Sequence, residues 1–85
     1  MSTRLLYFAW VKEKTGIAAE EVELPREVTT VAELIARLKT RGPEFDHAFD
    51  RSEVIRAAID RTHVRHDAAI GAAREIAFFP PVTGG

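Results

Sequence analysis

The sequence predicts an α+β domain in which one main helix covers one face of a small sheet. Short apolar segments near both ends and alternating segments between them indicate strands, and the middle of the chain carries one strong amphipathic helix signal. A chain of 85 residues has room for one compact core, so all of these elements must share it. We expect four to five strands.

The first two strands are predicted at residues 5–10 and 20–24. Leu5 to Trp10 is apolar throughout, which is typical of a strand covered on both faces, and Trp10 is expected at its partly buried end. The polar segment 12–16 ends in glycine and is expected to be a turn. Alternation in residues 20–24, with Val22 pointing inward, predicts a half-buried strand that closes a hairpin.

The clearest local signal is a helix that begins after Thr30. Thr30 and Glu33 have the spacing of a capping box. The residues spaced i, i+3, i+4 and i+7 are all apolar and form one stripe: Val31, Leu34, Ile35 and Leu38. Gly42-Pro43 is expected to stop this helix, and residues 43–50 are expected to form a short second one.

Three further strands are predicted in the second half of the chain. Residues 54–59 alternate, Asp60-Arg61 suits a turn, and residues 62–64 suit a short strand. The last strand, residues 74–79, ends in four apolar residues. We therefore expect it to be central and covered on both faces.

A single long helix cannot cover both faces of this sheet, so aromatic residues are expected on the open side. Phe78 alternates with Ile76 and is predicted to point beneath the helix. Phe79 and Phe8, with Ala77, are predicted to lie on the other side. For Phe8 and Phe79 the core and interface interpretations are close, and we favour an interface with a partner.

Composition excludes several classes of function. The net charge is −1 with interleaved signs, so nucleic acid is not an expected partner. No segment resembles a membrane span or secretory leader, which predicts a cytoplasmic protein that does not contact a membrane. The chain has no cysteine, which excludes disulfides, thiolate zinc sites and a cysteine nucleophile.

Metal binding and independent catalysis are not expected either. His63, His66 and Asp67 invite a metal interpretation, but they lack a third neutral ligand nearby, and we expect solvated loop residues instead. The sequence shows no Ser/His/Asp arrangement and no phosphate-binding loop. We therefore predict no catalytic residue, no metal and no bound cofactor.

The final segment is the most informative part of the chain. Pro80 and Pro81 have a fixed φ and no N–H, so they are expected to end the last strand and to project the C-terminal residues away from the sheet. We divide the chain into a domain of residues 1–79 and a flexible tail of residues 80–85, about 20 Å long when extended. Because Gly84 and Gly85 lack Cβ, the terminal carboxylate can enter a channel too narrow for side chains.

Four segments together carry a family resemblance that spans the chain. They are Leu6-Tyr7-Phe8-Ala9, Thr30-Val31-Ala32-Glu33-Leu34, Ala57-Ala58-Ile59 and Ala77-Phe78-Phe79-Pro80-Pro81-Val82-Thr83-Gly84-Gly85. In these segments the sequence resembles the small subunits of molybdopterin synthase, a sulfur-carrier family with a ubiquitin-like β-grasp fold. The resemblance implies a mixed sheet and a C-terminal tail that does the chemistry.

The resemblance implies that Gly85 is the covalent site of a sulfur carrier. A ubiquitin-activating-type enzyme would adenylate its carboxyl with ATP, and a persulfide sulfur would then displace AMP to leave a thiocarboxylate. Val82, Thr83 and Gly84, with the two prolines, would give the tail access to the active site of the large subunit. There the sulfur would attack cyclic pyranopterin monophosphate, and two transfers would make the dithiolene of molybdopterin.

The resemblance also implies partners. Two small subunits would join a large-subunit dimer in a heterotetramer, and Phe8, His63 and Phe79 match the family's apolar contact positions, although an aliphatic residue is usual at position 63. Three alternatives stay open. They are a β-grasp sulfur carrier for thiamine or tRNA thiolation, a ubiquitin-like protein modifier, and a binding module without C-terminal chemistry.

Overall fold

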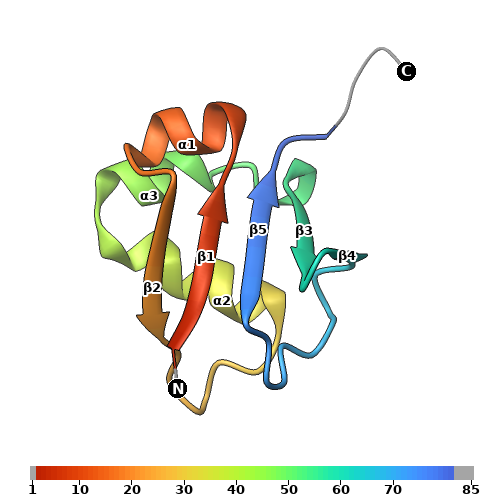
Figure 1. Cartoon of the computed structure of the whole chain (residues 1–85). Helices are drawn as coiled ribbons and strands as arrows, with labels where there is room; N and C mark the ends of the chain where they lie inside the picture. The colour runs from red at the N-terminus through yellow and green to blue at the C-terminus, as the bar shows by residue number, and fades with distance from the viewer. Residues whose placement is uncertain (1, 82–85) are drawn as a thin grey trace.

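The computed structural model describes residues 2–81 and shows a five-stranded sheet with α2 and α3 behind it (Figure 1). The strands are β1 (Ser2–Tyr7), β2 (Ala19–Glu23), β3 (Arg56–Ile59), β4 (Thr62–Val64) and β5 (Glu75–Phe79). The helices are α1 (Ala9–Thr15), α2 (Val31–Leu38) and α3 (Pro43–Ala48), with 3₁₀ turns at Lys39–Arg41 and Ser52–Val54. The order across the sheet is β2-β1-β5-β3-β4. This arrangement confirms the predicted α+β class and the mixed sheet.

The first and last strands form the centre of the sheet. β1 and β5 run parallel, with Tyr7 level with Phe78, while every other pair is antiparallel. The prediction of a central last strand is confirmed, and Ile76 and Phe78 are fully buried. The prediction that both faces of this strand are covered is wrong, because Ala77 and Phe79 stay partly exposed on the face away from α2.

The predicted first strand, residues 5–10, lies three residues too far along the chain, because β1 spans Ser2–Tyr7 and α1 replaces the expected turn at residues 12–16. Phe8 is still extended, with φ −121° and ψ 154°, and its N–H donates to the carbonyl of Phe78 at 3.0 Å. At Ala9 the φ angle changes to 53°, which takes the chain out of the sheet and into the helix. Trp10 is partly buried as expected, but it lies on α1.

α1 is a short helix that the sequence did not predict, because the apolar run of residues 5–10 indicates one strand. Val11 and Thr15, four residues apart, are its buried side chains. The helix ends at Gly16, whose φ of 83° suits a residue without Cβ and whose N–H donates to the carbonyl of Lys12 at 2.8 Å. A continuous apolar run has no period of its own, so it cannot show where a strand changes into a helix.

α2 begins as the sequence predicts. The hydroxyl of Thr30 accepts from the N–H of Glu33 at 3.2 Å, and the Glu33 carboxylate accepts from the N–H of Thr30 at 3.2 Å, which completes the capping box. The N–H of Ala32 donates to the carbonyl of His66 at 2.8 Å and ties the helix to the loop before β5. The predicted stripe is buried: Val31, Leu34, Ile35 and Leu38.

The end of α2 and the short helix after it follow the expected order. α2 ends at Leu38, and a 3₁₀ turn continues to Arg41. Gly42, with a φ of 149°, then separates this turn from Pro43, the first residue of α3. The expected second helix is confirmed, with a buried face of Phe45, Ala48 and Phe49.

No helix of residues 2–81 has the length and apolar character needed to cross a bilayer.

β3 and β4 form a hairpin with a two-residue turn. Asp60 and Arg61 both have positive φ, 48° and 73°, as this tight turn requires. The Asp60 carboxylate accepts the N–H groups of Arg74 and Glu75 at 3.1 and 3.0 Å, which fixes the turn against the start of β5. The predicted turn is confirmed, although β3 begins at Arg56 because residues 52–54 form a 3₁₀ turn.

The core contains a tyrosine whose hydroxyl needs a partner. The Tyr7 ring stacks on Phe78 with centroids 6.1 Å apart, and its hydroxyl donates to the Glu20 carboxylate at 2.7 Å. Arg41 pairs with the same carboxylate and lies over the ring of Phe45. Burial acts to raise the pKa of Glu20, but the hydrogen bonds from Arg41 and Tyr7 outweigh it and hold that pKa below its usual value. Burial and the bond to Glu20 raise the pKa of Tyr7.

The Glu20 pair predicts a stability that depends on pH. Because the pKa of Glu20 is lower in the folded state than in the unfolded chain, its contribution is present at neutral pH and is lost as the pH falls through the folded pKa. We expect Glu20→Gln to lower the free energy of unfolding by about 1–2 kcal/mol near pH 7 and by much less near pH 3. Urea unfolding of both proteins across this range measures the difference.

The control is Glu21→Gln, since Glu21 is exposed on the other face and, among residues 2–81, accepts a side-chain hydrogen bond only from the Ser2 hydroxyl. If the free energies of unfolding of wild type and Glu20→Gln differ by the same amount from neutral to acid pH, the lowered pKa of Glu20 is contradicted.

Candidate functional site

The sheet has one face that the helices leave open. Leu5, Tyr7, Ile76 and Phe78 are buried beneath the helices, so the side chains that alternate with them point the other way. Residues paired across the strands share a face, which defines the open face. Its members are Ser2, Arg4, Leu6, Ala19, Glu21, Glu23, Arg56, Ala58, His63, Glu75, Ala77 and Phe79.

The open face divides into a charged half and an apolar half. One row across β2, β1 and β5 consists of Glu21, Arg4 and Glu75. The next row, two residues further along β1, carries no acidic, lysine or arginine side chain and crosses all five strands: Ala19, Leu6, Ala77, Ala58 and His63. We call this row, together with Phe79, the apolar half; it lies toward the end of the sheet where β1 and β5 both finish, and Arg56, level with Phe79, borders it (Figure 1).

The three residues predicted at an interface meet at that end. Phe8 follows β1 and is 47% exposed, and Phe79 ends the neighbouring β5 and is partly exposed. His63 on β4 is exposed and lies against Phe79, with ring centroids 5.1 Å apart. The predicted division of the two phenylalanines is confirmed, because Phe78 is fully buried and Phe79 lies on the open face.

The chain leaves the sheet beside this apolar half. β5 ends at Phe79, and Pro80 and Pro81 come next, outside the strand and both partly exposed. The remaining tail residues predicted to carry the chemistry are Val82, Thr83, Gly84 and Gly85, which lie outside the described residues. The division into residues 1–79 and 80–85 and the role of Gly85 stay predictions.

Arg56 and Ala58 are among the open-face residues that the sequence prediction did not name. Arg56 lies level with Phe79, and Ala58 lies level with Ala77. A signal for both was present in the sequence, because the inward alternation of Ile55 and Ala57 sends their neighbours outward.

The two histidines have separate surroundings. His66 is half-buried, and its Nε2 donates to the carbonyl of Ile55 at 2.7 Å, so the expectation of a solvated loop residue is wrong for this side chain. His63 packs on Phe79 instead. Within residues 2–81 no three His, Cys, Asp or Glu side chains group together as metal ligands would.

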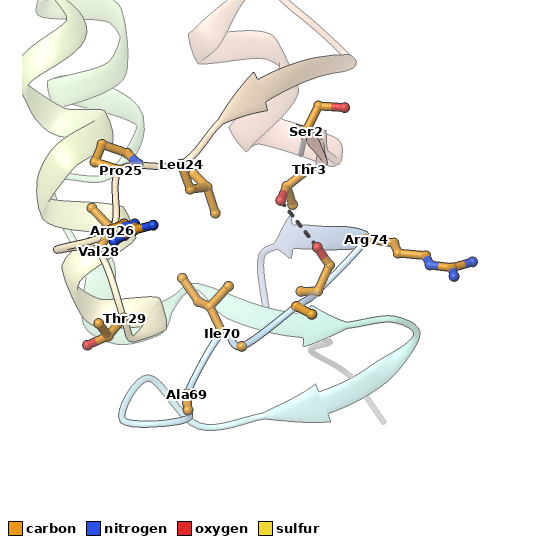
Figure 2. A pocket seen from close by; sticks show the side chains of 13 residues that line it. Ser2, Thr3, Leu24, Pro25, Arg26, Val28, Thr29, Ala69, Ile70 and Arg74 are labelled. Carbon is orange, nitrogen blue, oxygen red and sulfur yellow. Dashed lines mark hydrogen bonds between the residues drawn. The ribbon is translucent and has the colours of Figure 1, made fainter.

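A separate hollow of about 890 Å³ lies at the opposite end of the sheet, between residues 24–29 and 69–74 (Figure 2). Its wall is held together by a hydrogen bond from the hydroxyl of Thr3 to the carbonyl of Ala73 at 3.2 Å. Leu24, Val28 and Ile70 give it an apolar lining, and the guanidinium of Arg74 points away from it. In the described part of the chain, no set of polar side chains converges on this hollow as a specific ligand site requires.

Comparison with known sequences finds one family over nearly the whole chain. The sequence model of the ThiS family matches residues 5–85. The molybdopterin synthase sulfur carrier subunit of Escherichia coli is 34% identical over 82 residues, which cover 96% of this chain and 98% of that protein.

Solved structures share the fold. A protein from Pyrococcus furiosus described as a putative molybdopterin converting factor, subunit 1, superposes with a TM-score of 0.74 at 26% identity, covering 96% of this chain and 99% of the other. SAMP1 from Haloferax volcanii superposes over the full length of both chains with a TM-score of 0.72 at 23% identity, which shows likeness of fold alone.

Phe78 and Phe79 differ in burial, so we expect their substitution by alanine to lower the free energy of unfolding by different amounts. Phe78→Ala removes a fully buried ring, and we expect it to lower the free energy of unfolding by about 3–5 kcal/mol. Phe79→Ala removes a partly exposed ring, and we expect a loss of about 1–2 kcal/mol. Denaturant unfolding of the two variants measures both values. Equal losses would place Phe79 in the core.

Proposed function

The chain belongs to the ThiS family, and on that basis we propose that it is the sulfur-carrier subunit of molybdopterin synthase. The observation that carries the proposal is a family match that runs to Gly85, so it includes the residue on which the proposed chemistry depends. The similarity to the sulfur carrier subunit of Escherichia coli, which covers nearly all of both proteins, supports the same role.

In the proposed reaction Gly85 alternates between a carboxylate and a thiocarboxylate. An adenylating enzyme transfers AMP from ATP to the carboxyl and releases pyrophosphate. The terminal sulfur of a protein persulfide attacks the acyl carbon, and AMP leaves. A thiol then cleaves the resulting acyl disulfide, is itself oxidised to a disulfide, and frees the thiocarboxylate. The thiocarboxylate sulfur attacks cyclic pyranopterin monophosphate, and hydrolysis returns Gly85 to a carboxylate.

The fold supports this role through the position of its last strand. β5 lies in the centre of the sheet and ends at Phe79, so residues 80–85 begin beside the apolar half of the open face. A partner that covers Phe8 and Phe79 therefore lies next to the start of the tail. We propose that the large subunit covers this area, with two small subunits on a large-subunit dimer in the cytoplasm.

In this scheme the chain supplies the reactive carboxyl and its partners supply the catalytic groups. Val82, Thr83 and Gly84, after Pro80 and Pro81, would carry Gly85 into the active site of the large subunit. Fully extended, these tail residues span about 20 Å. The chain needs no cofactor of its own, because ATP and the sulfur donor act through the adenylating enzyme.

The chemistry predicts a specific change in mass. We expect incubation with the host's adenylating enzyme, ATP and a sulfur source to replace one carboxyl oxygen of Gly85 by sulfur. Intact mass spectrometry, with fragmentation to localise the change to the C-terminal peptide, measures it. A variant with one serine added after Gly85 is the matched control and should not change, although its melting temperature should equal that of wild type.

Other outcomes would identify the alternatives. Lysine-linked species of higher mass in place of the sulfur product would favour a protein modifier. No change of any kind, with the adenylating enzyme active on another carrier, would leave a binding module and contradict the proposal. A thiocarboxylate that supports thiamine or tRNA thiolation but not molybdopterin synthesis would move the carrier to another pathway.

The proposed docking surface predicts that Phe8→Ala weakens binding without unfolding the protein. Phe8 is 47% exposed in the free chain and its ring would be buried by the partner, so we expect a loss of roughly tenfold or more in affinity for the large subunit. Titration calorimetry gives the affinity, and a melting curve should show little change. Unaltered affinity would remove Phe8 from the interface.

A further inference from the structure

Two arginines face one another beside the apolar half of the open face. Ala57 and Val64 form the last pair at one end of the β3–β4 ladder. Arg56 and Arg65 are the next residues beyond this pair, so the register places them opposite each other, and both line the same hollow. Arg56 is also level with Phe79 on β5. Both arginine side chains are exposed. We call Arg56 and Arg65 the arginine pair.

The arginine pair has no anionic partner among residues 2–81. Neither guanidinium makes a hydrogen bond or salt bridge within that range. Glu53 is near, since it lines a hollow with both arginines, but its carboxylate lies 3.6 Å from Arg51. The Asp60 carboxylate is occupied by two backbone N–H groups. Like charges opposite one another on a sheet destabilise it, so the pair does not serve the fold of the free chain.

A partner that covers Phe79 must also meet the arginine pair. Arg56 lies directly beside Phe79 in the ladder, and His63 packs on Phe79 from β4. Removing an arginine from water without a counter-charge opposes binding by an amount comparable to what one buried aromatic ring contributes. The surface that covers Phe79 therefore has to offer a negative group at this position.

The space between the arginines suits a carboxylate. A hollow of about 290 Å³ is lined by Arg56, Ala57, His63, Val64 and Arg65. Guanidinium groups bind carboxylates with two parallel hydrogen bonds, which fix orientation as well as add energy. An aspartate or glutamate side chain can enter this hollow while the apolar area beside it packs on Phe79.

We propose that the arginine pair recognises a carboxylate on the large subunit and thereby sets the orientation of the docked carrier. The inference rests on the proposed function, because it takes the covering surface to be the large subunit. The apolar half supplies most of the buried area, whereas the arginine pair decides how the two proteins are turned relative to each other.

The test is the affinity of Arg56→Gln/Arg65→Gln for the host's large subunit, measured by titration calorimetry at low and high salt. We expect a loss of roughly tenfold or more at low salt, and a weaker dependence of affinity on salt than in wild type. The melting temperature should stay the same or rise, because two opposed charges are gone. Arg56→Lys/Arg65→Lys keeps the charges and should retain much more affinity than the glutamine variant.

The matched control is Arg26→Gln/Arg74→Gln, which removes the same charge from two exposed arginines around the hollow at the other end of the sheet. An equal loss of affinity in the control would show that the effect depends on net charge alone, which would overturn the inference. Unchanged binding by Arg56→Gln/Arg65→Gln, or a loss explained by a fall in melting temperature, would also overturn it. If wild type does not bind the large subunit, the proposed function itself fails. If the arginine pair binds only free phosphate, Arg56→Gln/Arg65→Gln keeps the wild-type affinity for the large subunit, and that result contradicts the proposal.

Discussion

The parallel pairing of β1 with β5 is the constraint on which the rest of the structure depends. It places the first and last strands side by side at the centre of the sheet, with Tyr7 level with Phe78 and their rings stacked in the core. The same register sets Phe8 beside the end of β5. Parallel strands finish at the same edge of a sheet. The exposed Phe8, the partly exposed Phe79 and the start of the tail therefore lie at one edge.

The two faces of this central pair have different chemistry because strands alternate with a period of two. The inward face contributes an aromatic core, and the Tyr7 hydroxyl there donates to the Glu20 carboxylate, which Arg41 also holds. The helices cover that face alone. The outward face therefore keeps Phe79 accessible to a partner, at no cost to the core that Phe78 completes.

The open face combines two kinds of surface, and both suit the carrier role that we propose. Contact with the apolar half does not by itself fix the orientation of a partner, since burial of apolar area is not directional. The arginine pair accepts a carboxylate in few orientations. If both act on the large subunit as we propose, affinity and alignment of the tail come from different residues, and substitutions can separate the two.

The sequence by itself determined the elements that short-range periodicity and capping define. These are α2 with its capping box at Thr30, the turn at Asp60-Arg61, and the opposite placement of Phe78 and Phe79. It also carried the family resemblance on which the proposed role of Gly85 rests.

Only the tertiary structure decided which strands are neighbours, where β1 changes into α1, and that Arg56 and Arg65 line one hollow beside Phe79. The first and third depend on pairings between residues far apart in the chain, which no local pattern contains. The second depends on an apolar run that suits strand and helix equally until its packing against the core selects one.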